Sequence, residues 1–387
     1  MASNNIETEI LVVDNNSTDG SSDFFEGEFS NVKFIWNKHN VGFAKANNIA
    51  LRQAKGEYIL FLNPDTIVPE DCLEKCVSFL DKNKDVGALG VKMIDGCGNY
   101  LRESKRSFPD PFTSLYKLVG LTRLFPHSKI FARYYMGHLS ENNDQEVDVL
   151  AGAFMMISRK VLDTVGGFDE QFFMYGEDID LSYRIQKAGF RNYYYSRTTI
   201  IHFKGESTKK ASLNYVRLFY GAMLLFVNKH YSQDVSRSYT TMIKLAIWLK
   251  GLQAGIAHFS KPSIQKKKDS KPRPILIVST QEDYEHILSM LNAATSSKKI
   301  IRLITSHNEA VGEAAGNMIK LKELINNKHV SEVIFSSNEI SVKDIASTMQ
   351  STNKGVTYKF YLKGSSAIVG SNDKDVAGSY IALQKIN

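Results

Sequence analysis

The chain has 387 residues, of which 43% are hydrophobic and 11% aromatic; this composition excludes a disordered protein and allows two domains with separate cores. Its formal net charge of +7 suits an anionic substrate, an anionic membrane surface or nucleic acid. The sequence contains no signal pattern and no apolar run of the roughly 20 residues that a membrane span needs. Cys72, Cys76 and Cys97 have neither metal-ligand nor disulfide spacing, so we expect reduced thiols in a cytoplasmic protein.

The first predicted strand covers residues 9–13, a compact apolar run typical of buried parallel strands. It ends at Asp14, which opens a polar turn rich in Asn, Ser and Gly. Open α/β sheets bind ligands beyond the carboxyl ends of their strands, so Asp14 is a candidate ligand-binding residue. An ordinary Asx turn explains the same residues equally well.

Two further strands are predicted over residues 32–36 and 57–62, with a helix over 44–54 between them. Asn63 and Asp65 follow the third strand directly. Their oxygens can face one point there and, together with a diphosphate, hold a divalent cation. An Asn-Pro-Asp turn also occurs as a plain chain reversal, but its position after a buried strand favours a ligand site.

Residues 105–145 form a long basic and aromatic segment for which we predict irregular structure. This segment either forms a wall of an acceptor site or is a surface insertion without contacts to a substrate. A buried strand is predicted over 147–157. Within it, Gly152 and Ala153 are small enough for a sugar to lie against the backbone.

The stretch 166–184 combines acidic residues and glycines with a dense aromatic run. The apolar spacing from Glu177 onward predicts a short helix that Gly189 ends. Glu177 and Asp178 then lie where a loop becomes a helix, and helix capping is the simpler interpretation. The aromatic loop 172–175 favours a different one, because it is too apolar for solvent. It indicates a partly desolvated carboxylate at the lip of a pocket, as a general base requires.

Two more strands are predicted over residues 192–195 and 198–201, and His202 follows them. A single histidine is more often structural than functional. The position of His202 after a strand, at the same edge as the other candidates, favours a ligand role. Lys204 and Ser207 come next and have side chains that can bind phosphate oxygens.

Six short motifs occur in order along the first half of the chain. They are VVDNNSTDG (12–20), NVGFAKANN (40–48), FLNPD (61–65), GAFM (152–155), GGFD (166–169) and GEDID (176–180). In this order and spacing they resemble the family 2 glycosyltransferases of the rhamnosyltransferase-like branch, over residues 9–207. The resemblance implies an α/β chain with a GT-A-type nucleotide-sugar domain.

The resemblance also implies roles for single residues. Asp14 would contact the nucleotide base or ribose. Asp65, with Asn63 beside it, stands at the DxD position that binds the metal and the diphosphate, and the implied cofactor is Mg²⁺ or Mn²⁺. His202 matches a histidine that meets the metal or the diphosphate. The remaining donor-binding candidates are Gly42, Lys45, Gly152 and Lys204.

Asp178 matches the catalytic base, and Glu177 is its neighbour in the ED motif. The implied reaction transfers a sugar, with rhamnose as one candidate, from a dTDP- or UDP-linked donor to a glycan or lipid-linked acceptor. Asp178 would take the acceptor proton as the diphosphate leaves on the opposite side, so that the anomeric centre inverts. The implied process is bacterial surface polysaccharide synthesis, and no nucleic acid partner is expected.

Family members begin with a further strand and helix that this sequence lacks before residue 9. We therefore expect a shortened chain, in which loss of a central strand removes hydrogen bonds and core contacts. This departure favours an alternative from another class, a non-catalytic scaffold protein at the membrane. A third alternative, a nucleotidyltransferase, would also use an aspartate after a strand and a DxD motif, but the ED helix is a poor match to that class.

Helices are predicted over 213–230 and 241–259. The second is amphipathic and basic, which suits either an anionic bilayer or packing on the catalytic domain. The bilayer alternative places the protein at the inner face of the plasma membrane. Residues 261–274 are a basic, Pro-rich linker.

The alternation of strands and helices in the C-terminal part predicts a small parallel α/β sheet. This part resembles the Rossmann-like domain found beside bacterial polysaccharide sugar transferases. Strands are predicted over 275–278, 300–304, 330–335 and 356–362, and helices near 282–293, 317–326 and 342–351. The first strand is not followed by Gly-x-Gly-x-x-Gly, so dinucleotide binding has no support. Residues 364–371 are either an anion-binding loop or a hairpin. The predicted division is 1–212 (GT-A domain), 213–260 (helical segment), 261–274 (linker) and 275–387 (Rossmann-like domain).

Overall fold

The computed structural model describes most of the chain. The residues outside the described part are 1–5, 26–28, 119, 204–212, 234–236, 243, 245–274, 295–300, 306–315, 328–329, 337–339, 353–354, 366, 371–378 and 383–387. Lys204, Ser207, the linker and nearly all of the helix predicted over 241–259 therefore lie outside it. In the described part, no helix is long and apolar enough to cross a bilayer.

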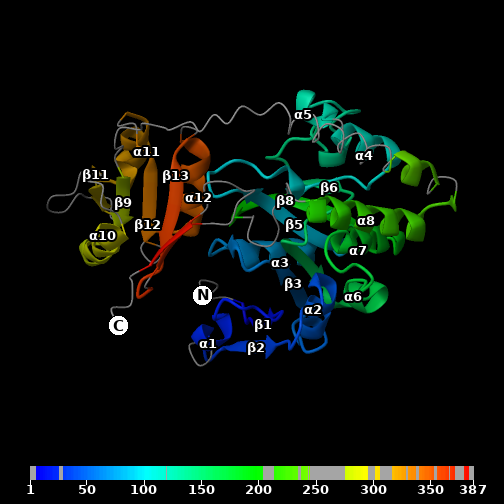
Figure 1. The fold of residues 1–387 in the computed structure, drawn as a ribbon, viewed down its shortest axis with the longest axis horizontal. Helices are drawn as coiled ribbons and strands as arrows, with labels where there is room; N and C mark the ends of the chain where they lie inside the picture. Colours follow the sequence, from blue (N-terminus) through cyan, green and yellow to red (C-terminus); the bar gives the residue numbers. More distant parts are fainter. Residues whose placement is uncertain are drawn as a thin grey trace.

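The N-terminal half contains two separate sheets among its described residues (Figure 1). β1 (Ile10–Asp14) and β2 (Val32–Trp36) pair in parallel and form the smaller one. The larger sheet has the order β3-β7-β5-β8-β4, and β6 pairs with β8 beside this path. Its strands are β3 (Tyr58–Leu62), β4 (Thr66–Ile67), β5 (Val86–Ile94), β6 (Gln145–Val147), β7 (Phe154–Ser158) and β8 (Arg191–His202).

Helices alternate with the strands of these two sheets along the chain (Figure 1). They are α1 (Ser21–Phe25), α2 (Phe43–Leu51), α3 (Cys72–Lys82), α4 (Pro111–Leu118), α5 (Leu121–Leu124), α6 (Arg159–Val165), α7 (Glu177–Lys187) and α8 (Leu213–His230), with 3₁₀ turns at Arg102–Ser104 and Arg133–Tyr135. The first three predicted strands and the helices predicted from residues 44, 177 and 213 are confirmed.

Three sequence predictions for this half were wrong in detail. The strand predicted over 147–157 is interrupted, because a turn with a 3.2 Å hydrogen bond from Phe154 N to Ala151 O separates β6 from β7. The strands predicted over 192–195 and 198–201 are one strand, β8, whose pairing with β5 shifts register at this point. The segment 105–145 contains α4 and α5 and is not irregular throughout.

The C-terminal sheet has the order β11-β10-β9-β12-β13-β14-β15 in the described residues, with the first five strands parallel. These are β9 (Ile275–Ser279), β10 (Ile301–Thr305), β11 (Gly316–Asn317), β12 (Glu332–Ser336), β13 (Thr357–Tyr361), β14 (Ala367–Gly370) and β15 (Ser379–Ala382), with helices α10 (Gln281–Ala294), α11 (Met318–Asn327) and α12 (Val342–Ser351). The predicted alternation is confirmed. β14 pairs antiparallel with β13, so the hairpin is the correct alternative for residues 364–370.

The two halves share a hydrophobic core. Ile94 and Ile201, at the ends of β5 and β8, are fully buried in one cluster with residues of the C-terminal sheet. The rings of Phe203 and Phe360 meet edge to face, with centroids 5.4 Å apart. The C-terminal half therefore packs against the end of β8 that carries His202.

Candidate active site

The carboxylate of Asp178 is held by two donors at the start of α7. Its Oδ2 accepts hydrogen bonds from Arg106 Nη2 (2.5 Å) and from the backbone N of Gly152 (3.1 Å). Arg106 also donates to Leu150 O at 2.8 Å, which fixes the guanidinium against the backbone. The interruption of the strand predicted over 147–157 is what turns the Gly152 N–H towards Asp178. No hydrogen bond from another described residue reaches Oδ1 of Asp178, so one oxygen is held and the other is available.

Glu177 is buried beside Asp178, with 7% of the residue exposed. Burial, followed by the charge of Asp178, raises the pKa of Glu177 to about 8. Its Oε2 and the Nε of Arg106 are buried without a hydrogen-bond partner in the described part of the chain. Near neutral pH Glu177 is therefore a carboxylic acid beside the ion pair of Arg106 and Asp178.

Arg106 was not among the predicted site residues. It lies in the segment 105–145, for which an acceptor-site wall and a surface insertion were both open, and it is 72 residues away from Asp178. A buried arginine is normally paired. Arg106 lies in a segment with no predicted strand or helix, so its burial and its partner had no signal in the sequence.

A second cluster lies where β4 pairs with the end of β8. Thr66 stands opposite His202 in the antiparallel pairing, and Phe203 N donates to Asp65 O at 3.0 Å. These contacts bring His202 Nε2 to 3.2 Å from Asp65 Oδ1, with both side chains largely buried. Both DxD-type residues thus lie at the sheet end predicted for them.

This cluster has donor atoms for a divalent cation. His202 Nδ1 and Asn63 Oδ1 are buried without a hydrogen-bond partner among the described residues. In the same part of the chain, no three His, Cys, Asp or Glu side chains are close enough to hold a metal by themselves. Oxygen donors and one imidazole therefore fit a cation whose remaining positions are filled by diphosphate oxygens.

A short backbone path links the two clusters. Asn63 N donates to Ala153 O at 3.0 Å, and the neighbouring Gly152 N donates to Asp178. A Cβ added to Gly152 would lie 3.4 Å from the Cβ of Asp178, so the backbone approaches the carboxylate closely at this point. The sheet thus brings Asn63 and Asp178 together although they are far apart in sequence.

Asp14 ends β1, as predicted, and its Oδ2 accepts a 3.0 Å hydrogen bond from Ser17 N. The Asx turn is therefore present. The adjacent Asn15 ties the smaller sheet to the loop before α2: its Oδ1 accepts from Asn37 Nδ2 (3.2 Å) and from Val41 N (3.0 Å). These contacts fix Asp14 at the rim of the smaller sheet.

Gly42 has a positive φ of 86°, and a Cβ there would lie 2.7 Å from atoms of Phe173. Phe43 N donates to Phe173 O at 2.8 Å, so the aromatic loop is fixed to the start of α2. Only part of this loop is buried: Phe172 lies in the core, whereas Phe173 is 52% exposed. The aromatic loop thus has one buried ring, Phe172, and one exposed ring, Phe173. Lys45, a predicted donor-binding residue, is exposed on α2.

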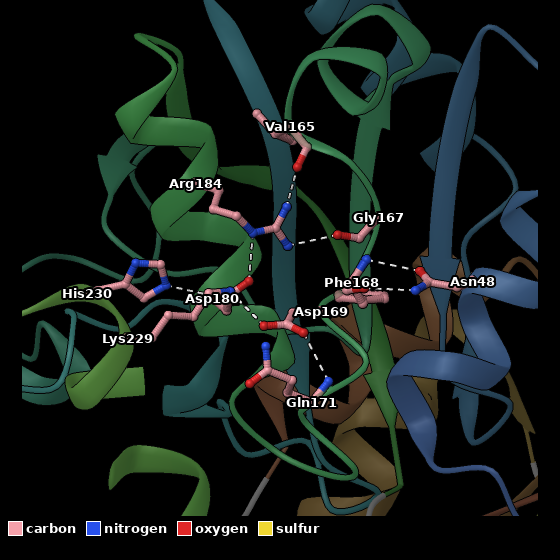
Figure 2. A network of polar contacts seen from close by, with 10 residues as sticks. All are labelled: Asn48, Val165, Gly167, Phe168, Asp169, Gln171, Asp180, Arg184, Lys229 and His230. Carbon is pink, nitrogen blue, oxygen red and sulfur yellow. Dashed lines mark hydrogen bonds and ion pairs between the residues drawn. The ribbon is translucent and has the colours of Figure 1, made fainter. Parts of the chain in front are cut away.

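A buried charge network supports α7 from the other side (Figure 2). Asp180 is fully buried and accepts hydrogen bonds from Arg184 Nε (2.7 Å), Lys229 Nζ (2.8 Å) and His230 Nε2 (2.7 Å). Burial by itself would raise the pKa of Asp180, but the Lys229 hydrogen bond, the charge of Arg184 and the His230 contact outweigh it and lower that pKa.

The same network positions the loop that precedes α7. Arg184 donates to the carbonyls of Val165 (2.5 Å) and Gly167 (2.7 Å). Asn48 Nδ2 donates to Phe168 O at 2.8 Å, and Phe168 N donates to Asn48 Oδ1 at 3.0 Å (Figure 2). The GGFD motif therefore joins α2 to α7 and keeps the ED residues in place.

Comparison with known proteins finds similar sequences for this part of the chain. Residues 2–166 match the family profile described as glycosyl transferase family 2, and residues 139–207 match one described as N-terminal domain of galactosyltransferase. The N-acetylglucosaminyl-diphospho-decaprenol L-rhamnosyltransferase of Mycobacterium tuberculosis is 27% identical over 60% of this chain and 80% of its own length. The rhamnosyltransferase WbbL of Escherichia coli is 32% identical over 42% of this chain and 61% of its own length.

Two solved structures also align with the chain. The mannosyltransferase PcManGT of Pyrobaculum calidifontis, in complex with GDP-Man and Mn²⁺, is 15% identical over 66% of this chain and 67% of that one, with a TM-score of 0.39. GalNAc-T7 with UDP, GalNAc and Mn²⁺ is 20% identical over 54% of this chain and 41% of that one, with a TM-score of 0.37. The family match confirms the predicted GT-A fold class. Residues 2–166 therefore carry a domain of glycosyltransferase family 2, and the chain is similar to rhamnosyltransferases over its N-terminal half.

Proposed function

We propose that the protein is an inverting glycosyltransferase that moves a sugar, with rhamnose as first candidate, from a dTDP- or UDP-linked donor to a lipid-linked glycan. The observation that carries this proposal is the backbone path from Asn63 through Ala153 and Gly152 to Asp178. It supports the proposal because hydrogen bonds join the Asn63 segment, next to Asp65, to the Asp178 carboxylate. The names of the relatives from M. tuberculosis and E. coli support rhamnose as the sugar, and the first name also supports a lipid-linked acceptor.

In this proposal Asp178 is the base and Arg106 is a positioning residue. Arg106 and Gly152 hold Oδ2 of Asp178, so Oδ1 receives the proton of the acceptor hydroxyl as that oxygen attacks the anomeric carbon. Glu177 keeps its own proton and limits the negative charge next to the base. Attack opposite the departing diphosphate inverts the anomeric centre.

Asp65, Asn63 and His202 are proposed to hold the diphosphate together with Mg²⁺ or Mn²⁺. The cation, when bound, neutralises charge on the leaving diphosphate. Asp14, Gly42, Lys45, Gly152 and Lys204 complete the proposed donor site. The domain division is proposed as 1–212, 213–260, 261–274 and 275–387, with the enzyme in the cytoplasm at the inner face of the membrane.

A calorimetric titration with dTDP and UDP, with and without Mn²⁺, tests the donor site. We expect metal-dependent binding by the native chain and its loss in Asp65→Asn. Asp163→Asn, which changes an exposed carboxylate on α6, is the matched control and should bind normally. Asp178→Asn should bind the nucleotide but lose transfer. Absence of nucleotide binding by the folded native chain would contradict the proposal.

A non-catalytic scaffold is the second candidate function. It is favoured by one observation: in the described residues, the β1–β2 sheet that carries Asp14 is not hydrogen-bonded to the sheet that carries Asp65 and His202. The titration separates the two candidates. A scaffold would remain folded and fail to bind nucleotide under every metal condition.

A further inference from the structure

The turn after α5 exposes large apolar side chains. Leu124 is 71% exposed, Ile130 62% and Phe125 50%. Phe112, at the start of α4, is 63% exposed. Among the described residues, Leu124, Phe112 and Ile130 have the highest exposure of all large hydrophobic side chains. Such a concentration of apolar surface in one short segment indicates an interaction surface.

This turn is well built. Phe125 N donates to Leu121 O at 2.9 Å, and Thr122 Oγ1 donates to Phe131 O at 2.7 Å. The ring of Phe131 contacts the rings of Phe125 and Tyr116, with centroid distances of 5.3 and 5.1 Å. The exposed side chains therefore project from a fixed scaffold.

Tyr116 extends the surface to α4. Phe112 precedes Tyr116 by four residues and therefore shares its side of the helix. Because Tyr116 contacts Phe131, and Phe131 contacts Phe125, α4 and the turn form one aromatic row.

The charge of the segment has a single sign. Residues 111–140 contain Lys117, Arg123, Lys129 and Arg133 and no Asp or Glu. Lys117 Nζ lies over the rings of Tyr134 and Phe219, at 4.0 and 4.3 Å from their centroids. The other three basic residues are exposed around the apolar side chains.

We propose that residues 123–133 are a docking surface for an anionic lipid bilayer. Apolar side chains that insert at the headgroup boundary, flanked by exposed Lys and Arg and free of acidic residues, match an anionic interface in both polarity and charge. The residues of this surface lie in the described part of the chain.

The surface connects directly to the residue that holds the base. Ser107 N donates to Tyr134 O at 2.9 Å, and Lys105 Nζ donates to the carbonyls of Met136 (3.1 Å) and Leu139 (2.6 Å). Residues just after this segment thus contact both chain neighbours of Arg106. Bilayer contact at the turn would present a lipid-linked acceptor on the Asp178 side. This consequence rests on the proposed function, but the proposed binding to lipid is independent of it.

Vesicle co-sedimentation of the full chain tests the proposal. Vesicles of phosphatidylcholine alone are compared with vesicles that also contain phosphatidylglycerol, at low and high salt. We expect binding to the anionic vesicles that weakens with salt. The triple variant Leu124→Ser, Phe125→Ser, Ile130→Ser should bind at least about tenfold more weakly. Arg123→Gln and Lys129→Gln should each cost about fivefold.

The matched control is the pair Leu362→Ser and Val369→Ser, which removes exposed apolar side chains from the C-terminal half and should leave binding unchanged. Equal binding by the triple variant and the native chain would overturn the proposal and assign binding to another segment. Failure of the native chain to bind anionic vesicles would also overturn it. Light scattering that finds a native dimer and a monomeric triple variant would instead assign the surface to a second copy. The same variants are also titrated with nucleotide, so that a loss of lipid binding can be told apart from a failure of the proposed function.

Discussion

Glu177 couples the stability of the fold to pH. Burial and the charge of Asp178 raise its pKa to about 8, compared with 4.5 for the ordinary group. Between these two values the folded chain keeps a proton that the unfolded chain has lost. The free energy of unfolding should therefore fall by roughly 1.4 kcal/mol per pH unit as the pH rises through this window.

Urea unfolding of Glu177→Gln across this pH range checks the prediction. The variant should lack this fall and should be more stable than the native protein near pH 8, because its amide cannot ionise. Glu57→Gln, which changes an exposed carboxylate, should keep the native pH dependence. Parallel stability curves for Glu177→Gln and the native protein would contradict the assignment.

Arg106 fixes the orientation of Asp178 and should affect turnover more than donor binding. Arg106→Ala removes the 2.5 Å contact to Oδ2 and leaves the carboxylate held by Gly152 alone. We expect kcat to fall by about 100-fold, with a small change in the donor KM. Arg106→Lys should restore part of the rate, since it keeps the charge but not the planar fork.

The exposed neighbour Arg102 supplies the control, because Arg102→Ala should be neutral. A readout specific to positioning is the pH–rate profile, which should change in Arg106→Ala and not in Arg102→Ala. An unchanged profile together with native kcat would mean that Arg106 is only structural.

At the scale of elements, α7 depends on the fully buried Asp180. Asp180→Asn leaves the charges of Arg184 and Lys229 around a neutral amide and should cost about 3–5 kcal/mol in the free energy of unfolding. The partners lower the pKa of Asp180 below the ordinary 3.8 in the folded chain. Ionised Asp180 therefore contributes its full stabilisation above pH 3.8, and this stabilisation is lost as the pH falls through the pKa of the folded state. Denaturant unfolding at neutral and acid pH should show native and variant curves converging in acid, whereas Asp163→Asn should match the native curve throughout.

The sequence predicted elements that have a local signature. β1, β3 and β9 are short apolar runs, and α7 begins where a glycine and two carboxylates precede a helical pattern. β5 was missed although it is buried throughout. Tertiary packing explains the glycine at position 87 of β5. A Cβ there would lie 2.6 Å from Ile185 of α7, so glycine lets the helix pack closely on the strand.

The site was predictable only in part, for the same reason. Asp65, His202 and Asp178 stand at element ends that local patterns locate. The contacts of Arg106 with Asp178 and of Asn63 with Ala153 join segments far apart in the chain, and no local pattern contains them. The turn that presents the Gly152 N–H appears in the sequence as a continuous apolar run, since turn and strand residues there are equally buried.

At the scale of the whole molecule, the shared core should make the two halves unfold together. Ile94 and Ile201 of the N-terminal sheet lie in one cluster with Phe360 and Ile345 of the C-terminal half. A second contact joins them at the start of α12, where Val342 N donates to Glu70 Oε1 at 2.7 Å. Because neither half buries these side chains alone, each half stabilises the other.

Phe360→Ala tests this coupling. The change removes the ring that meets Phe203, one residue after His202, and should cost about 3–5 kcal/mol. If the core is shared, both halves should lose stability in a single transition, and the affinity for UDP with Mn²⁺ should fall because the end of β8 loses its support. Leu362→Ala, which shortens an exposed side chain on the same half, should change neither quantity. Two separate transitions, with nucleotide affinity unchanged in Phe360→Ala, would mean that the C-terminal half is an independent unit and that the donor site does not depend on it.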